Sequence, residues 1–167
     1  MPLRETIRDK WIEISETFSV PKQLFDHQAD TIALLLSKNN VFCGLPTGSG
    51  KTLPQLTAVL FTEGTALVIP PLLTIEKQMC EVLNAWNISY LNLSVYSNPQ
   101  DIATDLESKS PRIIISSIEK ISDRMFQKAL INIKLEYVSI DEAQVSFKNV
   151  VQAKCAQCTI KRYNISF

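Results

Sequence analysis

The chain has 167 residues, of which 46% are hydrophobic and 20% are charged, so it can bury one core of ordinary domain size. Its 17 basic and 17 acidic side chains cancel, which excludes attraction of a polyanion through the overall field of the chain. The charged N-terminus does not resemble a secretory signal, and no apolar run reaches the roughly 20 residues that cross a bilayer.

The cysteines favour reduced thiols over a metal site. Cys43 and Cys80 lie in apolar segments, where cysteine is usually a small core residue. Cys155 and Cys158 form one CxxC pair, but a structural zinc site needs further ligands, and the single histidine, His27, is far away in the sequence. We therefore expect an intracellular protein, nuclear in a eukaryote or cytoplasmic in a bacterium.

Two helices are predicted first. Residues 4–17 mix charged and apolar residues at near-helical spacing, which predicts an amphipathic helix packed against the domain. Its apolar face consists of Ile7, Trp11, Ile14 and Phe18. Asp26 is expected to cap a second helix, which ends at Asn39-Asn40.

Strands and helices then alternate. Apolar and β-branched runs predict strands over 41–45, 66–70, 89–96, 112–116 and 135–141, and helical spacing predicts helices over 51–61, 73–86, 100–108 and 123–131. The alternation predicts an α/β fold, a single domain whose parallel sheet carries helices on both faces. Ligands of such sheets bind beyond the carboxyl ends of the strands.

A glycine-rich loop lies between the first predicted strand and its helix. Residues 44–53 read GLPTGSGKTL, and Gly48 and Gly50 let the backbone wrap closely around phosphates. Lys51 would reach the β- and γ-phosphates of a nucleotide, and the Thr52 hydroxyl would ligate Mg²⁺. The nucleotide is thus assigned to Thr47, Gly48, Ser49, Gly50, Lys51 and Thr52.

One position departs from the usual form of this motif. The pattern GxxxxGK[ST] has glycine where Leu45 stands, and Gly44 is one residue too early. The alternative is an ordinary turn that happens to contain GKT. The strand before it, the helix after it and a later acidic motif favour the phosphate site.

That acidic motif follows the last predicted strand. YVSIDEAQ spans residues 137–144 and ends the strand in two adjacent carboxylates. Asp141 would hold Mg²⁺ opposite Thr52, and Glu142 would orient and deprotonate the attacking water. The alternative is a solvated strand end that carries two acidic residues.

Together these motifs resemble the first RecA-like domain of superfamily-two helicases, and most closely the RecQ-like DNA helicases, over about residues 20–145. LFDHQ resembles the motif whose glutamine reads adenine, which implies that role for Gln28. LPTGSGKT resembles the family's MPTGxGKS, including a large apolar residue at Leu45. DEAQ stands where RecQ proteins have DEAH, so Gln144 takes the place of a catalytic histidine; glutamine hydrogen-bonds but carries no charge.

The resemblance also implies contact with single-stranded DNA. VIPPLLTIEKQ resembles a segment that contacts a DNA strand in the family, which points to Pro71, Leu72 and Thr74. IISSIEKI resembles the TPE-R type motif, which points to Ser117 and Lys120. These strand-end loops offer hydroxyls, amides and one lysine, which suit backbone phosphates. Without the resemblance, Pro70-Pro71 is a plain strand terminator.

Three regions are expected: an N-terminal helix (1–19), a RecA-like ATP-binding domain (20–145) and a divergent or truncated tail (146–167). The family's aromatic-rich loop after the acidic motif is reduced to Phe147. We expect the second lobe, which supplies an arginine finger in the family, to be missing from these 167 residues. The isolated chain should therefore bind nucleotide, hydrolyse it very slowly and unwind nothing.

Three functions remain open. The first is the Mg-ATP-binding lobe of an ATP-dependent DNA helicase. The second is a non-catalytic nucleotide-binding module, either a short isoform or a degenerate copy. The third is an unrelated P-loop ATPase, but the LSGGQ-like sequence of transporter ATPases is absent, and ring ATPases lack a counterpart of Gln28.

Overall fold

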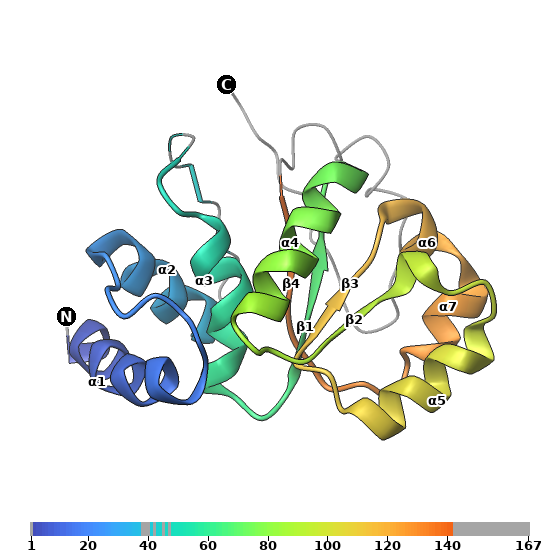
Figure 1. Ribbon diagram of the computed structural model, residues 1–167, viewed down its shortest axis with the longest axis horizontal. Coiled ribbons are helices and arrows are strands. Elements are labelled where there is room, and N and C mark those ends of the chain that lie inside the picture. Colours follow the sequence, from blue (N-terminus) through green and yellow to red (C-terminus); the bar gives the residue numbers. More distant parts are fainter. Residues whose placement is uncertain (1, 38–40, 42, 45, 47, 142–167) are drawn as a thin grey trace.

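The computed structural model describes residues 2–37, 41, 43–44, 46 and 48–141. In this part of the chain four parallel strands form one sheet, in the order β2-β3-β1-β4 (Figure 1). The strands are β1 (Thr65–Ile69), β2 (Tyr90–Asn92), β3 (Ile113–Ile115) and β4 (Leu135–Ile140). The predicted α/β fold with a parallel sheet is confirmed.

Helices cover both faces of the sheet, as predicted. One face packs against α1 (Pro2–Thr17), α2 (Asp26–Leu36), α3 (Thr52–Thr57) with the 3₁₀ turn η1 (Ala58–Phe61), and α4 (Leu73–Ala85). The other packs against α5 (Pro99–Lys109), α6 (Ile118–Ser122) and α7 (Arg124–Ala129). A short 3₁₀ turn, η2 (Leu93–Val95), follows β2. None of the described helices is both long and apolar enough to cross a membrane.

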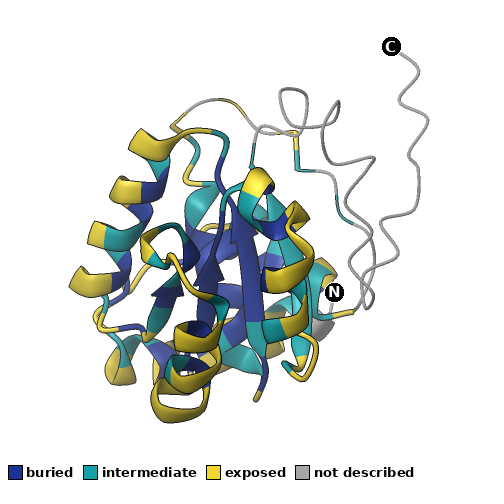
Figure 2. Cartoon of the chain, turned by 90° about the vertical axis from the view of Figure 1, so that its right-hand side faces the viewer, coloured by how far each residue is buried: buried dark blue, intermediate teal, exposed yellow. Residues whose placement is uncertain are grey.

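Alternation along the strands divides the core in two. Successive strand side chains point to opposite faces, so Ala66 and Val68 of β1 pack with α1–α4, whereas Leu67 packs with α5–α7. In β3, all three isoleucines are fully buried because helices cover both sides. Figure 2 shows the buried strands between helices whose outer surfaces are exposed.

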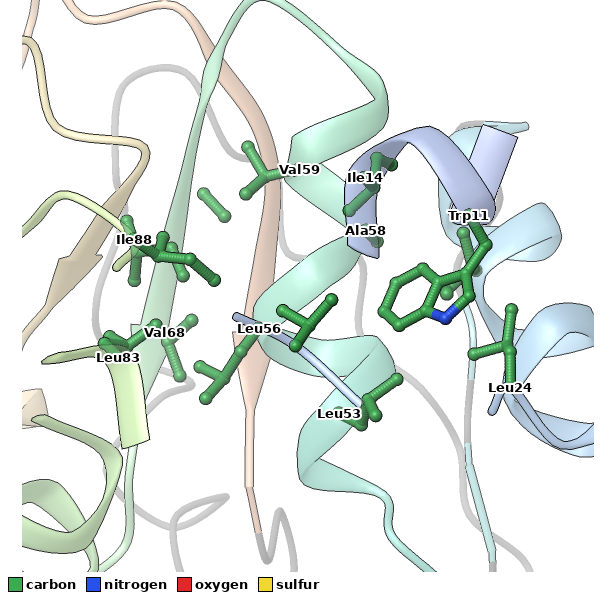
Figure 3. Packing of buried hydrophobic residues seen from close by; sticks show 14 of the residues in the cluster. Trp11, Ile14, Leu24, Leu53, Leu56, Ala58, Val59, Val68, Leu83 and Ile88 are labelled. Carbon is green, nitrogen blue, oxygen red and sulfur yellow. The ribbon is translucent and has the colours of Figure 1, made fainter. Parts of the chain in front are cut away.

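The N-terminal helix belongs to the first of these clusters. Trp11 is 2% exposed, its indole N–H donates to the Pro21 carbonyl at 3.1 Å, and its ring stacks on Phe61. Figure 3 shows Trp11 among Leu24, Leu53 and Ala58, residues that come from three other segments. The predicted amphipathic helix is therefore confirmed, and α1 is an integral part of the core.

The strand predicted over 41–45 is wrong for the described residues in it. Val41, Cys43 and Gly44 form no strand, and β4 pairs only with β1 in the described chain. Cys43 lies instead beside α2, with its Sγ 3.9 Å from the Thr31 hydroxyl. The prediction rested on an apolar run alone, and such a run becomes a strand only where a neighbouring strand accepts its hydrogen bonds.

Two local predictions also need correction, and one helix was missed. Asp26 does not cap α2; it is the first helical residue, and its carboxylate pairs with Arg8, because α1 brings a cation beside it. The strand predicted over 89–96 is confined to β2, since the Asn92 side chain accepts from the Ser94 amide and turns the chain. Helix α6 was not predicted; Ser117 caps it by accepting from the Lys120 amide.

Candidate nucleotide-binding site

The candidate site lies at the carboxyl edge of the sheet. Helix α3 begins at the same edge at which β1 and β4 end (Figure 1). Asp141 directly follows β4, and its amide donates to the Ile69 carbonyl at 3.1 Å, so the backbone of Asp141 stays in register with the end of β1. The fold thus brings Thr52, the first residue of α3, and Asp141 to one edge.

Two glycines of the predicted phosphate loop, Gly48 and Gly50, have left-handed backbones. Gly48 has φ +82° and Gly50 has φ +76°, a region that other residues adopt only with strain. A Cβ on Gly48 would meet open space, so the backbone angle alone favours glycine there. A Cβ on Gly50 would lie 2.6 Å from the Gln28 amide nitrogen, so this position also requires the absence of a side chain.

Gln28 connects the start of α2 to this loop. Its side chain is buried, its Nε2 donates to the Gly50 carbonyl at 3.2 Å, and its Oε1 accepts from the Phe25 amide at 3.0 Å. An amide side chain has two N–H groups and two oxygen lone pairs, so one donor and one acceptor position are left over. The structure thus places Gln28 against the loop. Its role in binding adenine, which the family resemblance implies, stays a prediction.

His27 makes a second contact with the loop, which sequence reasoning missed. Its Nε2 lies 2.9 Å from the Ser49 carbonyl oxygen, and its ring stacks on Phe25 at a centroid distance of 5.9 Å. Two features of the sequence could have pointed to His27: it directly precedes Gln28 in LFDHQ, and it is the single histidine of the chain.

The loop also holds a buried hydroxyl. Ser49 Oγ is inaccessible and has no hydrogen-bond partner among the described residues, although the Ser49 amide donates to the Pro46 carbonyl at 3.3 Å. A buried hydroxyl without a partner is costly unless a ligand or water completes its hydrogen bonds. Lys51 and Thr52, which follow, are both half-buried.

Tyr137 and Arg112 hold the far end of the α3 segment. The Tyr137 hydroxyl donates to the Gln55 carbonyl at 2.8 Å and accepts from the Val59 amide at 3.2 Å, and burial raises its pKa. Arg112 donates to the Val59 carbonyl at 2.7 Å. These groups satisfy backbone atoms where α3 passes into η1, and so fix the helix that carries Thr52 at its other end.

The residues assigned to DNA divide into two groups. Leu72 is 59% exposed, Thr74 is exposed and Pro71 is half-buried, all where β1 leads into α4. Ser117 and Lys120 already have structural contacts. Ser117 caps α6, and the Lys120 ammonium donates to the Tyr96 carbonyl at 2.5 Å and lies 4.3 Å from the centre of the Phe126 ring.

Several predicted positions lie outside the described residues. They are Leu45, Thr47, Glu142, Gln144, Phe147, Cys155 and Cys158. The assignment of Thr47 to the nucleotide, and of Glu142 and Gln144 to catalysis, therefore stays a prediction.

The sequence is similar to known helicases over most of its length. Residues 25–164 match the family model of DEAD/DEAH box helicases. The chain is 32% identical to the ATP-dependent DNA helicase RecQ of Pasteurella multocida over 114 residues, which cover 66% of this chain and 18% of that protein. It is 28% identical to RecQ of Haemophilus influenzae over 150 residues, covering 84% and 24%.

A third relative is named for a different nucleic acid. The chain is 27% identical to the ATP-dependent RNA helicase dbp-9 of Neurospora crassa, over 76% of this chain and 22% of that protein. The chain spans about a fifth of the length of the RecQ relatives. The family match covers most of the sequence, and the RecQ similarity extends over most of it too. The chain therefore belongs to the DEAD/DEAH box helicases, with a RecQ-like form of their RecA-like domain.

Proposed function

We propose that this chain is the Mg-ATP-binding lobe of an ATP-dependent DNA helicase. The observation that carries the proposal is the loop from Gly48 to Thr52. Gly48 and Gly50 both have left-handed backbones, and the Gly50 carbonyl accepts from Gln28. The loop leads into α3 at the edge where Asp141 follows β4 and donates to the Ile69 carbonyl. A loop of this kind turns successive amides toward one anion.

Each nucleotide role falls to a residue of this edge. Lys51 neutralises the β- and γ-phosphate oxygens, and Gln28 uses its remaining hydrogen-bond positions on the adenine edge. Thr52 and Asp141 hold Mg²⁺, whose chemistry is to stabilise the charge that develops on the transferred phosphoryl group. To Glu142 we assign the orientation and deprotonation of the attacking water, and to Gln144 the place of the family's catalytic histidine. The buried Ser49 hydroxyl, which has no partner within the described part of the chain, supports a polar ligand at this loop.

The nucleic-acid partner is proposed to be single-stranded DNA, bound through its backbone. The RecQ relatives carry DNA helicase names, which favours DNA over RNA. Pro71, Leu72 and Thr74 offer an accessible surface at the carboxyl edge. Ser117 and Lys120 contribute in the proposal mainly by fixing α6, since their polar groups have partners within the protein.

Unwinding is proposed for the chain only together with a second helicase lobe. In the family that lobe supplies the arginine that stabilises the transition state, a contribution of a thousandfold or more in turnover. The 167-residue chain alone is expected to bind Mg-ATP and turn it over very slowly. The non-catalytic alternative also predicts Mg-ATP binding. It differs in predicting that ATP hydrolysis is not stimulated when the second lobe of a RecQ relative is added.

The test is isothermal titration calorimetry of Mg-ATP with the full chain and with Lys51→Ala. Binding to the unaltered chain and its loss in the variant are expected, because the Lys51 ammonium is the one positively charged side chain that the proposal places on the phosphates. Lys128→Ala is the matched control, an exposed lysine of α7 on the opposite side of the sheet. Equal affinities in the unaltered chain and Lys51→Ala would refute the nucleotide assignment.

A further inference from the structure

We infer that His27 is a positioning residue of the phosphate loop, which holds the Ser49 carbonyl toward α2 so that the following amide faces the nucleotide phosphates. The inference rests on the proposed function, because it assigns the loop to a nucleotide. It adds a residue that the phosphate-loop motif does not contain.

The hydrogen bond fixes the direction of one peptide unit. A carbonyl oxygen only accepts, so His27 Nε2 carries the hydrogen in the 2.9 Å contact with Ser49. In a trans peptide the C=O and the next N–H point in opposite directions within one plane. Holding the Ser49 carbonyl toward α2 therefore points the Gly50 N–H away from α2.

Gln28 does the same for the next peptide unit. Its Nε2 holds the Gly50 carbonyl at 3.2 Å, which points the Lys51 N–H away from α2 as well. Two adjacent side chains at the start of one helix thus orient two consecutive amides toward the same side. Gly50 has φ +76° and Lys51 has the right-handed angles φ −54° and ψ −33°, a sequence of conformations in which successive amides converge on an anion.

Phe25 restrains the imidazole that makes this contact. The two rings are nearly parallel, with an interplanar angle of 7° and a centroid distance of 5.9 Å. The Phe25 amide is in turn fixed by Gln28 Oε1 at 3.0 Å. Phe25, His27 and Gln28 therefore form one unit, in which the ring stack limits rotation of the imidazole and keeps Nε2 directed at Ser49.

The test compares side chains that do and do not reach the Ser49 carbonyl. The amide nitrogen of glutamine reaches the place of Nε2, whereas that of asparagine is one methylene shorter. Calorimetry with Mg-ADP on the full chain should show His27→Asn weakened about fivefold, the ratio that corresponds to roughly 1 kcal/mol for one hydrogen bond. His27→Gln should bind close to the unaltered chain, as should Leu34→Ala, an exposed residue of the same helix.

The unfolding midpoint without nucleotide separates positioning from stability. Both His27→Asn and His27→Gln should unfold in a single transition well above the temperature of the titration, so the difference in affinity arises in the loop and not from unfolding. His27→Ala is measured as a second variant that removes the ring without adding a polar group, and it should match His27→Asn. Unchanged affinity in His27→Asn and His27→Ala, or equal weakening in His27→Asn and His27→Gln, would overturn the inference.

The failure of this inference is distinct from failure of the proposed function. Binding that is lost in Lys51→Ala but unaffected in His27→Asn overturns only the role of His27. Absence of Mg-ADP binding by the unaltered chain overturns the proposed function, and the inference with it.

Discussion

Gly50 is the residue on which the loop geometry depends most. It has a left-handed backbone, and its Cα lies so close to the Gln28 amide that an added Cβ would be 2.6 Å from Nε2. The first property disfavours any other residue, and the second breaks the contact that orients the next amide. The motif predicted a glycine here, but not that a buried glutamine supplies the steric reason for it.

Gly50→Ala is expected to lower Mg-ATP affinity by on the order of tenfold or more, because the left-handed backbone and the crowding together cost about 1–3 kcal/mol in the binding-competent loop. Calorimetry measures the loss. Gly48→Ala is the informative comparison: it shares the positive φ, but its Cβ meets open space, so its effect should be smaller. A larger effect at Gly48 than at Gly50 would contradict the steric account.

The residues around the loop show where sequence reasoning ends. Residues 48–52 are contiguous in the sequence, so the motif alone was enough to predict the phosphate loop. The contact between His27 and Ser49 joins residues 22 apart, and the clamp from Tyr137 to Gln55 joins residues 82 apart. One sequence does not disclose which distant side chains meet, because those pairings follow from packing. Lys120 is a second example. The motif suggested a DNA contact for it, but did not predict its contacts with the Tyr96 carbonyl and the Phe126 ring.

At the scale of elements, α1 packs on the outer side of the helices next to the candidate nucleotide loop. It packs against α2 and η1 through Trp11, and Arg4 forms a two-point pair with Asp30 of α2. His27 and Gln28 lie in the first turn of α2, so the position of α2 determines where the loop is held. The sequence predicted α1 as a packed amphipathic helix; which elements it packs on came from the structure.

Trp11→Ala should lower the free energy of unfolding by about 3–5 kcal/mol, because a fully buried indole leaves a large cavity and its hydrogen bond to Pro21 is lost. Denaturant unfolding followed by circular dichroism measures the change. The next residue gives the control: Ile12 is 60% exposed, and Ile12→Ala should change stability by less than about 0.5 kcal/mol. Similar losses in the two variants would show that α1 does not pack as described.

Apolar runs predicted strands correctly where a neighbouring strand pairs with them, and wrongly where none does in the described chain. Residues 113–115 read as a fully buried strand, and β3 is buried on both faces between β2 and β1. Val41, Cys43 and Gly44 belong to an equally apolar run but form no strand. Correspondingly, all six residues of β4 are half-buried, since this strand pairs on one side only within the described chain.

At the scale of the whole molecule, alternation of strands and helices determined the architecture. It predicted parallel pairing and helices on both faces, and it placed the phosphate loop and Asp141 at one edge. The strand order β2-β3-β1-β4 did not follow from the sequence, because several orders satisfy the same alternation. Two separate core clusters result, and each tyrosine with a shifted pKa contacts one of them.

Those tyrosines make the fold sensitive to alkali. Burial raises the pKa of Tyr90 and Tyr137, and burial with the Asp105 carboxylate raises the pKa of Tyr96 to about 12. Each phenol binds its proton more tightly in the folded state, so its contribution is complete below the unfolded pKa of about 10 and is lost as pH rises toward the folded pKa. The free energy of unfolding should therefore fall as pH rises above about 10.

Tyr96→Phe should make this alkaline decline shallower, because one raised pKa is removed. Denaturant unfolding at a series of alkaline pH values measures the slope in both proteins. At neutral pH the variant is expected to be less stable, since the hydrogen bond to Asp105 is lost. A slope in Tyr96→Phe equal to that of the unaltered chain would contradict the pKa direction given for Tyr96.

The proposed function requires one metal ion shared between Thr52 and Asp141 at the carboxyl edge of the sheet. Replacing Mg²⁺ by paramagnetic Mn²⁺ with ADP broadens amide resonances close to the metal. We expect broadening of the amide resonances of Gly50, Lys51, Thr52 and Asp141, while those of Leu106 in α5 and Phe126 in α7, in the other core cluster, keep their intensity. Broadening of the loop with Asp141 unaffected, or no selective broadening at all, would contradict it.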